Sequence, residues 1–572
     1  MLNFREVRDA NGEVVCIETS FNRRHLLTAP ELNKGCAFTE QERVDFDLIG
    51  RLPSRVETID EQVDRIYQQY QEQPTPLQKN VFLNNLHDFN ATLFYKLVGL
   101  HLQEMLPVIY TPTVASAVEN FSLEMRRPRG LYLSYPQKDQ IEAILRNRLM
   151  TEVDLVVVTD GERVLGIGDQ GVGGMDISIA KLMVYTLCAG ISPHRVIPIQ
   201  LDTGTNNEKL LNDPMYLGWR HARVRGKDYD DFIEHFVKTL RKVLPNIYLH
   251  WEDFAKENAR KNLEKYRQEM CTFNDDMQGT GIVTLANVMS AVRMIGSDMS
   301  KQCFVFLGAG TAGVGIADQI YHEVCQSGLT PEQARACFWL VDRDGLVVDT
   351  QADLMDFQKP FARKAVDVAG WTLDKSGQVM LADVVRNVHP TVLIGCSTVF
   401  GAFSEAMVKD MAAHTPSPII MPLSNPTSHC EATAKDLVEW TQGKAVIATG
   451  SPFAPVKYNG KVYEIAQGNN AFVFPGLGLG VIIAQANRMT DGMIRAAALT
   501  LSDNSPSRQN KTASLLPSFD DVVAVSHKIA KAVAKQAIKD GVAGIDNTTD
   551  LDVLIQRNTW TPKYYPYKRV AE

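Results

Sequence analysis

Apolar residues recur at three- and four-residue intervals through the first part of the chain. The stretches 59–73 and 91–110 show this period, with polar residues between the apolar positions. Such spacing places apolar side chains on one face of a helix. We therefore expect a helical N-terminal region over residues 1–130.

Short apolar runs rich in β-branched residues follow, at 154–160, 195–202 and 246–254. Each is separated from the next by a stretch long enough for a helix, an alternation typical of a parallel sheet covered by helices. A second series of such runs begins at Phe304. The pattern predicts a multidomain α/β protein.

The two series suggest the order of the domains. After the helical N-terminal region, we expect a central parallel α/β domain for substrate and metal, and a Rossmann-like domain for a dinucleotide. Helix-forming stretches after residue 467 are expected to pack back on the first sheet, and an aromatic tail closes the chain. The predicted bounds are 131–277 plus 467–540 for the central domain, 278–466 for the Rossmann-like domain and 541–572 for the tail.

Composition narrows the classes of function. The chain has 572 residues, of which 45% are hydrophobic and 22% charged, which is typical of compact soluble domains. The net charge of -8 argues against recruitment of nucleic acid or an anionic membrane. The nine cysteines form no C-x-x-C pair, and charged residues interrupt the N-terminal apolar stretches. We expect reduced thiols and a cytoplasmic protein.

A glycine-rich loop follows the first run of the second series. Gly308, Gly310 and Gly313 match G-x-G-x-x-G between an expected strand and an expected helix, the setting in which such a loop binds a pyrophosphate. Asp342 ends the next expected strand, where a carboxylate can accept hydrogen bonds from an adenosine ribose. The alternative is a strand-helix turn without nucleotide.

An earlier loop competes with this one. Gly166, Gly168 and Gly171 also match the motif, and Asp202 ends the following run. The earlier loop follows a turn instead of a strand and leads to Lys181. We therefore prefer the later loop, although spacing alone leaves both open.

Carboxylates gather at the last run of the first series and shortly after it. Glu252 and Asp253 end the run 246–254, and Asp275 and Asp276 follow further on. Ligands bind at the carboxyl ends of parallel strands, and carboxylate oxygens suit Mg or Mn. The alternative is that these are solvated loop acids and a helix cap. The local sequence around Lys181, Tyr110 and Arg163 likewise favours ordinary structural roles unless another observation points to catalysis.

Several segments together resemble the malic enzyme family in order and spacing, from about Asn33 to the C-terminus, and the NAD-dependent bacterial type in particular. The segments are PVIYTPTV, DGERVLGIGDQGVGGMDISIAK, WEDF, FNDDMQGTG, FLGAGTAGVGIA, PLSNPT, ATGSPF and QGNNAFVFPGLGLG. The resemblance implies oxidative decarboxylation of L-malate to pyruvate and CO2, with NAD and Mg or Mn as cofactors. It also implies an active site in the cleft between the central and Rossmann-like domains.

The resemblance implies a role for each candidate residue. It makes Lys181 the general base, Tyr110 the general acid and Asp275 a catalytic carboxylate beside them. The other implied sites are metal ligands Glu252, Asp253 and Asp276; malate-binding residues Arg163, Asn425 and Asn470; and cofactor-binding residues Gly308, Gly310, Gly313, Asp342 and Asn425.

The implied cofactor is NAD, because Asp342 would repel a 2′-phosphate and Gln358 stands where NADP-preferring relatives tend to carry lysine. Arg343 and Lys359 weaken this inference. The animal mitochondrial type of the family uses two arginines in a fumarate-activation site; Arg65 matches the first, but the second position is Phe89. Activation by fumarate at that site is therefore not expected.

Two alternatives stay open. Segments such as NDPMYLG and QKPFAR also resemble malolactic enzymes, which convert L-malate to L-lactate and CO2 while retaining NAD. The other is a metabolite-sensing protein that kept the fold and lost the chemistry, although no implied catalytic position is substituted. Relatives are usually homodimers or homotetramers, so we expect an oligomer.

Overall fold

The computed structural model describes the chain except residues 1–3, 11, 149–151, 165, 374–376 and 572. The chain divides into two compact units, each of which is described by itself. The first comprises residues 1–273, 478–488 and 541–572, and the second comprises residues 274–477 and 489–540. Of the segment 467–540, which the sequence pattern assigns to the first sheet, only residues 478–488 group with the first unit, whereas 467–477 and 489–540 group with the second.

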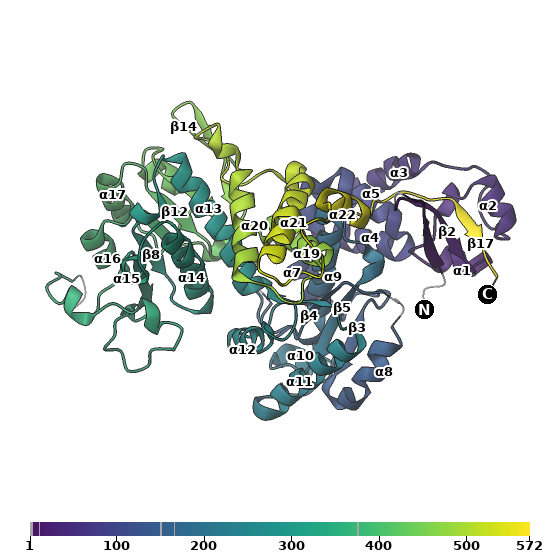
Figure 1. Cartoon of the computed structure of the whole chain (residues 1–572), viewed down its shortest axis with the longest axis horizontal. Helices are drawn as coiled ribbons and strands as arrows, with labels where there is room; N and C mark the ends of the chain where they lie inside the picture. Colours follow the sequence, from purple (N-terminus) through teal and green to yellow (C-terminus); the bar gives the residue numbers. More distant parts are fainter. Residues whose placement is uncertain (1–3, 11, 149–151, 165, 374–376, 572) are drawn as a thin grey trace. The chain divides into compact units, whose positions relative to one another are not determined.

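A parallel sheet forms the centre of the first unit (Figure 1). Its strand order is β3-β5-β4-β6-β7, and the pairs β3·β5, β4·β5 and β4·β6 are parallel. The strands are β3 (Leu131–Ser134), β4 (Leu155–Thr159), β5 (Val196–Asp202), β6 (Tyr248–Trp251) and β7 (Thr272–Asn274). Every residue of β4 and β6 is buried, which explains why these runs contain no polar-apolar alternation.

Helices connect the strands of this sheet. They are α8 (Ile141–Arg146), α9 (Met175–Ala189), α11 (Gly226–Val243) and α12 (Lys256–Tyr266). Among the described helices, the stretch Gly171–Ala189 is long and apolar enough to cross a membrane, but 89% of that window is buried. Its apolar character is therefore that of a core helix packed on β4 and β5.

The N-terminal region is helical over much of its length. Its helices are α1 (Arg23–Thr28), α2 (Glu40–Asp45), α3 (Ile59–Gln71), α4 (Pro76–Phe89), α5 (Ala91–Leu100), α6 (Leu102–Ile109) and α7 (Thr113–Glu119). Threonine side chains cap α2, α3 and α4 by accepting backbone N–H groups.

The helical N-terminal region also contains two strands. Strands β1 (Phe4–Arg8) and β2 (Val14–Thr19) form an antiparallel pair, and β17 (Tyr567–Arg569) pairs with β2 in parallel. Figure 1 shows β17 beside β2 near the N-terminus. An isolated two-stranded hairpin has only marginal stability in water. The third strand, and the helices on which the sheet packs, therefore stabilise the β1–β2 pair. Strand β17 lies more than five hundred residues after β2 in the sequence, so no local sequence pattern predicts that the two strands pair.

The second unit contains a sheet of order β10-β9-β8-β11-β12-β13-β16. Its central strands are β8 (Phe304–Leu307), β9 (Phe338–Asp342), β11 (Val392–Gly395), β12 (Ile419–Pro422) and β13 (Val446–Thr449), all parallel to their neighbours in that group. Edge strand β10 (Gly345–Leu346) is antiparallel, and β16 (Ala466–Gln467) pairs with β13. The predicted α/β fold with two parallel sheets is confirmed.

Helices complete the second unit. Those that concern the site are α13 (Thr280–Met294), α14 (Thr311–Gln326), α17 (Glu405–His414), α18 (Ala434–Trp440), α20 (Asp491–Asp503) and α21 (Val522–Lys539). The pair α20 and α21 packs together, and α20 also packs on α13. Because α13 belongs to the second unit, these contacts explain why residues 489–540 group with that unit.

Candidate active site

The end of β6 carries the first two acidic candidates. Glu252 follows the strand and donates its backbone N–H to Val158 of β4, 2.9 Å away, so β4 and β6 determine its position. Asp253 has a φ of 55°, a conformation uncommon for a side-chain-bearing residue, and its carbonyl accepts the N–H of Arg163 at 3.0 Å. Both side chains are buried. The sequence-predicted carboxylates of β6 therefore face other polar groups and not bulk solvent.

Lys181 meets one of these carboxylates. It lies on α9, is 2% exposed, and its Nζ is 3.0 Å from Glu252 Oε1. The same Nζ is 5.2 Å from the ring centroid of Tyr110, the buried residue at the C-terminal end of α6. The structure thus brings together a lysine, a tyrosine and a carboxylate that are far apart in sequence.

A histidine supports Glu252 from behind. His250 Nε2 is 2.7 Å from Glu252 Oε2, and the Tyr185 hydroxyl is hydrogen-bonded to His250 Nδ1 at 2.8 Å. His250 is fully buried. The chain Tyr185–His250–Glu252–Lys181 therefore restrains the carboxylate through both oxygens. Sequence reasoning missed His250, whose only signal was its place two residues before Glu252 on the same face of a strand.

The loop after β4 is held by a buried ion-pair network. Arg223 donates from Nε and Nη2 to the two carboxylate oxygens of Asp169, at 2.7 and 2.8 Å. It also donates to Thr203 Oγ1 at 3.1 Å and to the carbonyl of Asp160 at 3.0 Å. Asp160 accepts the Tyr229 hydroxyl, and burial raises the pKa of this aspartate to about 6. These contacts shape the loop that carries Arg163.

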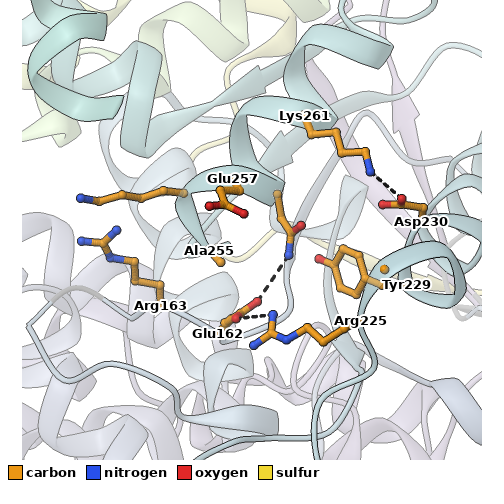
Figure 2. Close-up of a pocket in the computed structure, with 11 residues that line it drawn as sticks. Glu162, Arg163, Arg225, Tyr229, Asp230, Ala255, Glu257 and Lys261 are labelled. Carbon is orange, nitrogen blue, oxygen red and sulfur yellow. Dashed lines mark hydrogen bonds and ion pairs between the residues drawn. The ribbon is translucent and has the colours of Figure 1, made fainter. Parts of the chain in front are cut away.

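Arg163 itself is exposed and borders a cavity of about 560 Å³ (Figure 2). Elsewhere in the lining, Glu162 pairs with Arg225 and accepts a hydrogen bond from Asn258. The guanidinium of Arg163 makes no ion pair or side-chain hydrogen bond with the residues that the structure describes, and Figure 2 shows it directed away from Glu162. An accessible guanidinium of this kind is available for a carboxylate ligand.

In the second unit, the preferred glycine loop joins β8 to α14. Gly308 has a φ of 106°, and a Cβ there would be 2.7 Å from the carbonyl oxygen of Cys396. A Cβ at Gly313 would overlap the carbonyl oxygen of Gly308. Both glycines are therefore required for the close approach of helix and strand. Gly310 caps α14, whose N-terminal N–H groups are suited to a pyrophosphate.

Asp342 is the last residue of β9, next to β8, as expected for a residue that recognises a ribose. Its Oδ1 accepts the backbone N–H of Arg343, whose own side chain is 90% exposed. Gln358 donates to the carbonyl of Ala309 in the glycine loop at 2.8 Å. The neighbouring Lys359 pairs with Asp356. The arginine and lysine that weakened the preference for NAD are thus turned to solvent or to an acid.

The competing loop is built differently. Gly166, Gly168 and Gly171 all have positive φ, but several residues separate them from β4, and Gly171 begins a short 3-10 turn before α9. Asp202, which ends β5, accepts backbone N–H groups of Gly204 and Trp219. The strand-loop-helix geometry of a dinucleotide site is present at the later loop, in agreement with the sequence-based preference.

The remaining candidates lie in the second unit. Asp275 and Asp276 begin a π-helical turn (Asp275–Gly279) directly after β7. Asn470 donates from Nδ2 to Asp275 Oδ2 at 2.9 Å and to Thr280 Oγ1 at 3.3 Å, so it fixes the Asp275 carboxylate. Asn425 follows β12, and its Oδ1 accepts the Ser451 hydroxyl at 2.7 Å.

Comparison with known proteins shows to which family the chain belongs. Residues 87–267 match the model for the malic enzyme N-terminal domain, and residues 277–538 match that for the malic enzyme NAD binding domain. The chain belongs to the malic enzyme family. The NAD-dependent malic enzymes of Photorhabdus laumondii and Edwardsiella ictaluri are each 50% identical to it over 546 residues, which is 96% of this chain and 96% of each relative.

Solved malic enzymes share the fold. The malic enzyme of Entamoeba histolytica has a TM-score of 0.54 at 23% identity and covers 89% of either chain. The malic enzyme of Pyrococcus horikoshii has a TM-score of 0.52 at 22% identity, over 80% of this chain and 88% of that one. The resemblance inferred from the sequence is therefore confirmed, and the malolactic alternative is not favoured by these relatives.

Proposed function

We propose that this malic enzyme family member oxidatively decarboxylates L-malate to pyruvate and CO2 with reduction of NAD. The observation that carries the proposal is the buried contact of Lys181 with Glu252 beside Tyr110, together with a dinucleotide loop in the second unit. The names of the 50% identical relatives support the same reaction.

The carboxylates fit a divalent cation by the chemistry of their donors. Glu252 and Asp253 directly follow β6, and Asp276 follows β7, the strand next to β6 in the sheet. All three offer the oxygen ligands that Mg and Mn prefer. We propose them as the metal ligands. A bound cation would polarise the malate hydroxyl and stabilise enolate charge, and bound NAD would accept the hydride from C2.

The side chains of the chain supply the proton transfers. Lys181 takes the proton of the 2-hydroxyl as the hydride leaves C2, which gives a ketone able to accept the electrons of the breaking carbon-carbon bond. Loss of CO2 from that ketone leaves the enolate of pyruvate. Tyr110 donates the proton that arrives at the methylene carbon, and Lys181, with its Nζ on the face of the Tyr110 ring, returns the hydroxyl proton to it.

Substrate orientation is the role proposed for the remaining polar candidates. Arg163 pairs with a malate carboxylate, since its guanidinium is accessible, while Asn425 and Asn470 fix the substrate through their amides. Asp275 is the proposed catalytic carboxylate that tunes Lys181, and Asn470 donates a hydrogen bond to its Oδ2. Gly308, Gly310, Gly313, Asp342 and Asn425 bind NAD. Cytoplasmic location and assembly as a homodimer or homotetramer are further parts of the proposal.

The test follows NADH by absorbance after L-malate, Mn and NAD are mixed with the protein, and assays pyruvate and lactate in the same tube. Net NADH with pyruvate is expected. Lactate without net NADH would instead establish malolactic chemistry, and neither product would favour a sensing protein.

A variant separates catalysis from binding. Lys181→Ala removes the proposed base and should abolish turnover while NAD binding, measured by titration calorimetry, is retained. Lys359→Ala is the matched control, because its ammonium pairs with a fully exposed aspartate and should be dispensable. Full activity of Lys181→Ala would refute the assignment of the base.

A further inference from the structure

Glu431 is a buried carboxylate at the end of the second sheet where parallel strands leave room for ligands. It is 0% exposed and lies just before α18. Its Oε1 accepts the Ser397 N–H at 2.8 Å, the Ser397 hydroxyl at 2.9 Å and the Ser424 hydroxyl. Its Oε2 accepts the Ser424 N–H at 3.4 Å. One carboxylate therefore holds the loops that follow β11 and β12.

The partners of this carboxylate are unusual for the chain. Other buried glutamates pair with cations, as Glu42 does with Lys34 and Glu323 with Arg495. Among the residues that the structure describes, Glu431 makes its side-chain contacts with neutral serine hydroxyl and backbone N–H groups. Burying a carboxylate without a cation is costly unless several donors satisfy it. Such a residue is suited to fixing backbone geometry.

The two serines pass this restraint on to the loops. Ser424 Oγ accepts the N–H of Thr398 at 2.8 Å, and Thr398 has a φ of 59°. A threonine in this left-handed region is strained, so the loop needs such an outside hold. On the other side, Ser424 directly precedes Asn425, a proposed cofactor and substrate ligand.

These loops lie beside the dinucleotide loop. A Cβ at Gly308 would be 2.7 Å from the carbonyl oxygen of Cys396, the residue before Ser397. In the sheet order β9-β8-β11-β12, Asp342 lies on one side of the glycine loop and the Ser397 and Ser424 loops on the other. A dinucleotide spans such an edge with its two halves on opposite sides of the central strand. With the adenosine ribose at Asp342, the nicotinamide half would therefore lie over β11 and β12.

We propose that Glu431 is a positioning residue for the nicotinamide half of NAD. It keeps the Ser397–Thr398 and Ser424–Asn425 segments in the backbone conformation that receives this half. It touches neither the cofactor nor the substrate itself. The inference rests on the proposed NAD-dependent function and adds to it a residue that acts on one half of the cofactor only.

The direct test is Glu431→Gln. Glutamine keeps the shape but replaces one acceptor oxygen by an NH2 group, which cannot accept a hydrogen bond from a serine. Calorimetric titration with NAD should show affinity weakened about tenfold. 5′-AMP contains only the adenosine half, so the affinity of the variant for 5′-AMP should stay within about twofold of the wild-type affinity. A twofold change corresponds to roughly 0.4 kcal/mol of binding free energy. In turnover, KM for NAD should rise more than KM for malate.

Glu323→Gln is the matched control. Glu323 is also buried in the second unit, but it lies at the C-terminal end of α14 and pairs with Arg495 at 2.6 Å. Twelve helical residues separate it from the start of α14, roughly 18 Å at the rise of an α-helix. This variant should lower the melting temperature and leave NAD and AMP affinities unchanged.

Several outcomes would overturn the proposal. It fails if Glu431→Gln binds NAD as the wild type does, or if NAD and AMP weaken equally, since the carboxylate would then only stabilise the domain. Should that variant not fold, Ser397→Ala removes one hydroxyl donor, keeps the carboxylate and should weaken NAD binding in the same selective way. Binding is measured without turnover, so a wild type that binds NAD but does not oxidise malate would refute the proposed function and leave this test intact.

Discussion

Arg223→Met should destabilise the first unit by about 3–5 kcal/mol of unfolding free energy at neutral pH. The Arg223 side chain is 1% exposed and donates two hydrogen bonds to Asp169, at 2.7 and 2.8 Å. It also lies 4.0 Å from the Asp160 carboxylate, which is fully buried. Methionine keeps the unbranched apolar stem but leaves both carboxylates without their cation. This loss of unfolding free energy is the one typical of removing one partner from a buried ion pair.

Arg225→Met is the matched control. Arg225 lies two residues further on and pairs with Glu162, but its side chain is 49% exposed. Ion pairs with an exposed partner contribute about 0–1 kcal/mol, because water solvates the exposed charge, here the Arg225 guanidinium. The two variants lose the same charge and the same number of atoms. They differ only in burial and in what the lost guanidinium held.

The pH dependence of the effect follows from Asp160. Its pKa is raised to about 6 by burial, while Arg223 counteracts that rise. Removal of the guanidinium should raise the pKa further. The pKa of Asp160 in the folded protein is higher than the value of about 3.9 for an unfolded chain. At a pH above the folded pKa, the charged carboxylate therefore destabilises the fold, and this destabilisation decreases as the carboxylate takes up a proton. The penalty of Arg223→Met should therefore shrink as the pH falls toward 6, between the higher pKa of Asp160 in the variant and its wild-type value of about 6.

The assay is urea unfolding of wild type, Arg223→Met and Arg225→Met, followed by tryptophan fluorescence and circular dichroism at neutral and mildly acidic pH. KM for malate should also rise in Arg223→Met, because Asp169 and Asp160 shape the loop that carries Arg163. The reasoning would be refuted if the two variants lost equal stability, or if acidification enlarged the penalty of Arg223→Met.

Three further predictions address the cofactor, the substrate and the terminal sheet. Gly313→Ala should abolish NAD binding because its Cβ would overlap the Gly308 carbonyl, while Gly315→Ala, with nothing within 4 Å, should bind NAD normally in the same titration. Arg163→Gln should raise KM for malate at least about tenfold through loss of a charge-assisted pair, with an unchanged melting temperature. Lys34→Met should cost about 3 kcal/mol in urea unfolding, since it strips the buried Glu42 of its cation; a cost below about 1 kcal/mol would contradict this.

Much of the second unit was predictable from the sequence, for a local reason. The run before Gly308 is a fully apolar strand, the glycines follow at once, and the next residues have helical spacing. Each of these sequence features lies within a short stretch of the chain. The two glycines are required locally, because no side chain fits at Gly308 or Gly313. The same holds for Asp342, whose place at a strand end is visible from the run that precedes it.

The candidate site was predictable only in part. Lys181, Tyr110 and Glu252 were individually unremarkable in the sequence, and the resemblance to a family singled them out. Their contacts join α9, α6 and the end of β6 across long stretches of chain. His250, Arg223 and Glu431 were missed because no periodic pattern distinguishes a buried polar residue that holds a loop from a solvated one.

By itself, the sequence determined the two series of parallel strands, the dinucleotide loop and the family, because apolar periodicity and glycine requirements are local and a long ordered set of motifs is specific. Only the tertiary structure decided that β17 completes the N-terminal sheet, that Arg223 neutralises Asp169, and that Glu431 meets two serines. These are pairings between residues distant along the chain. Burial makes an unpaired polar group costly, so the fold has to supply a partner, but the sequence does not say from where.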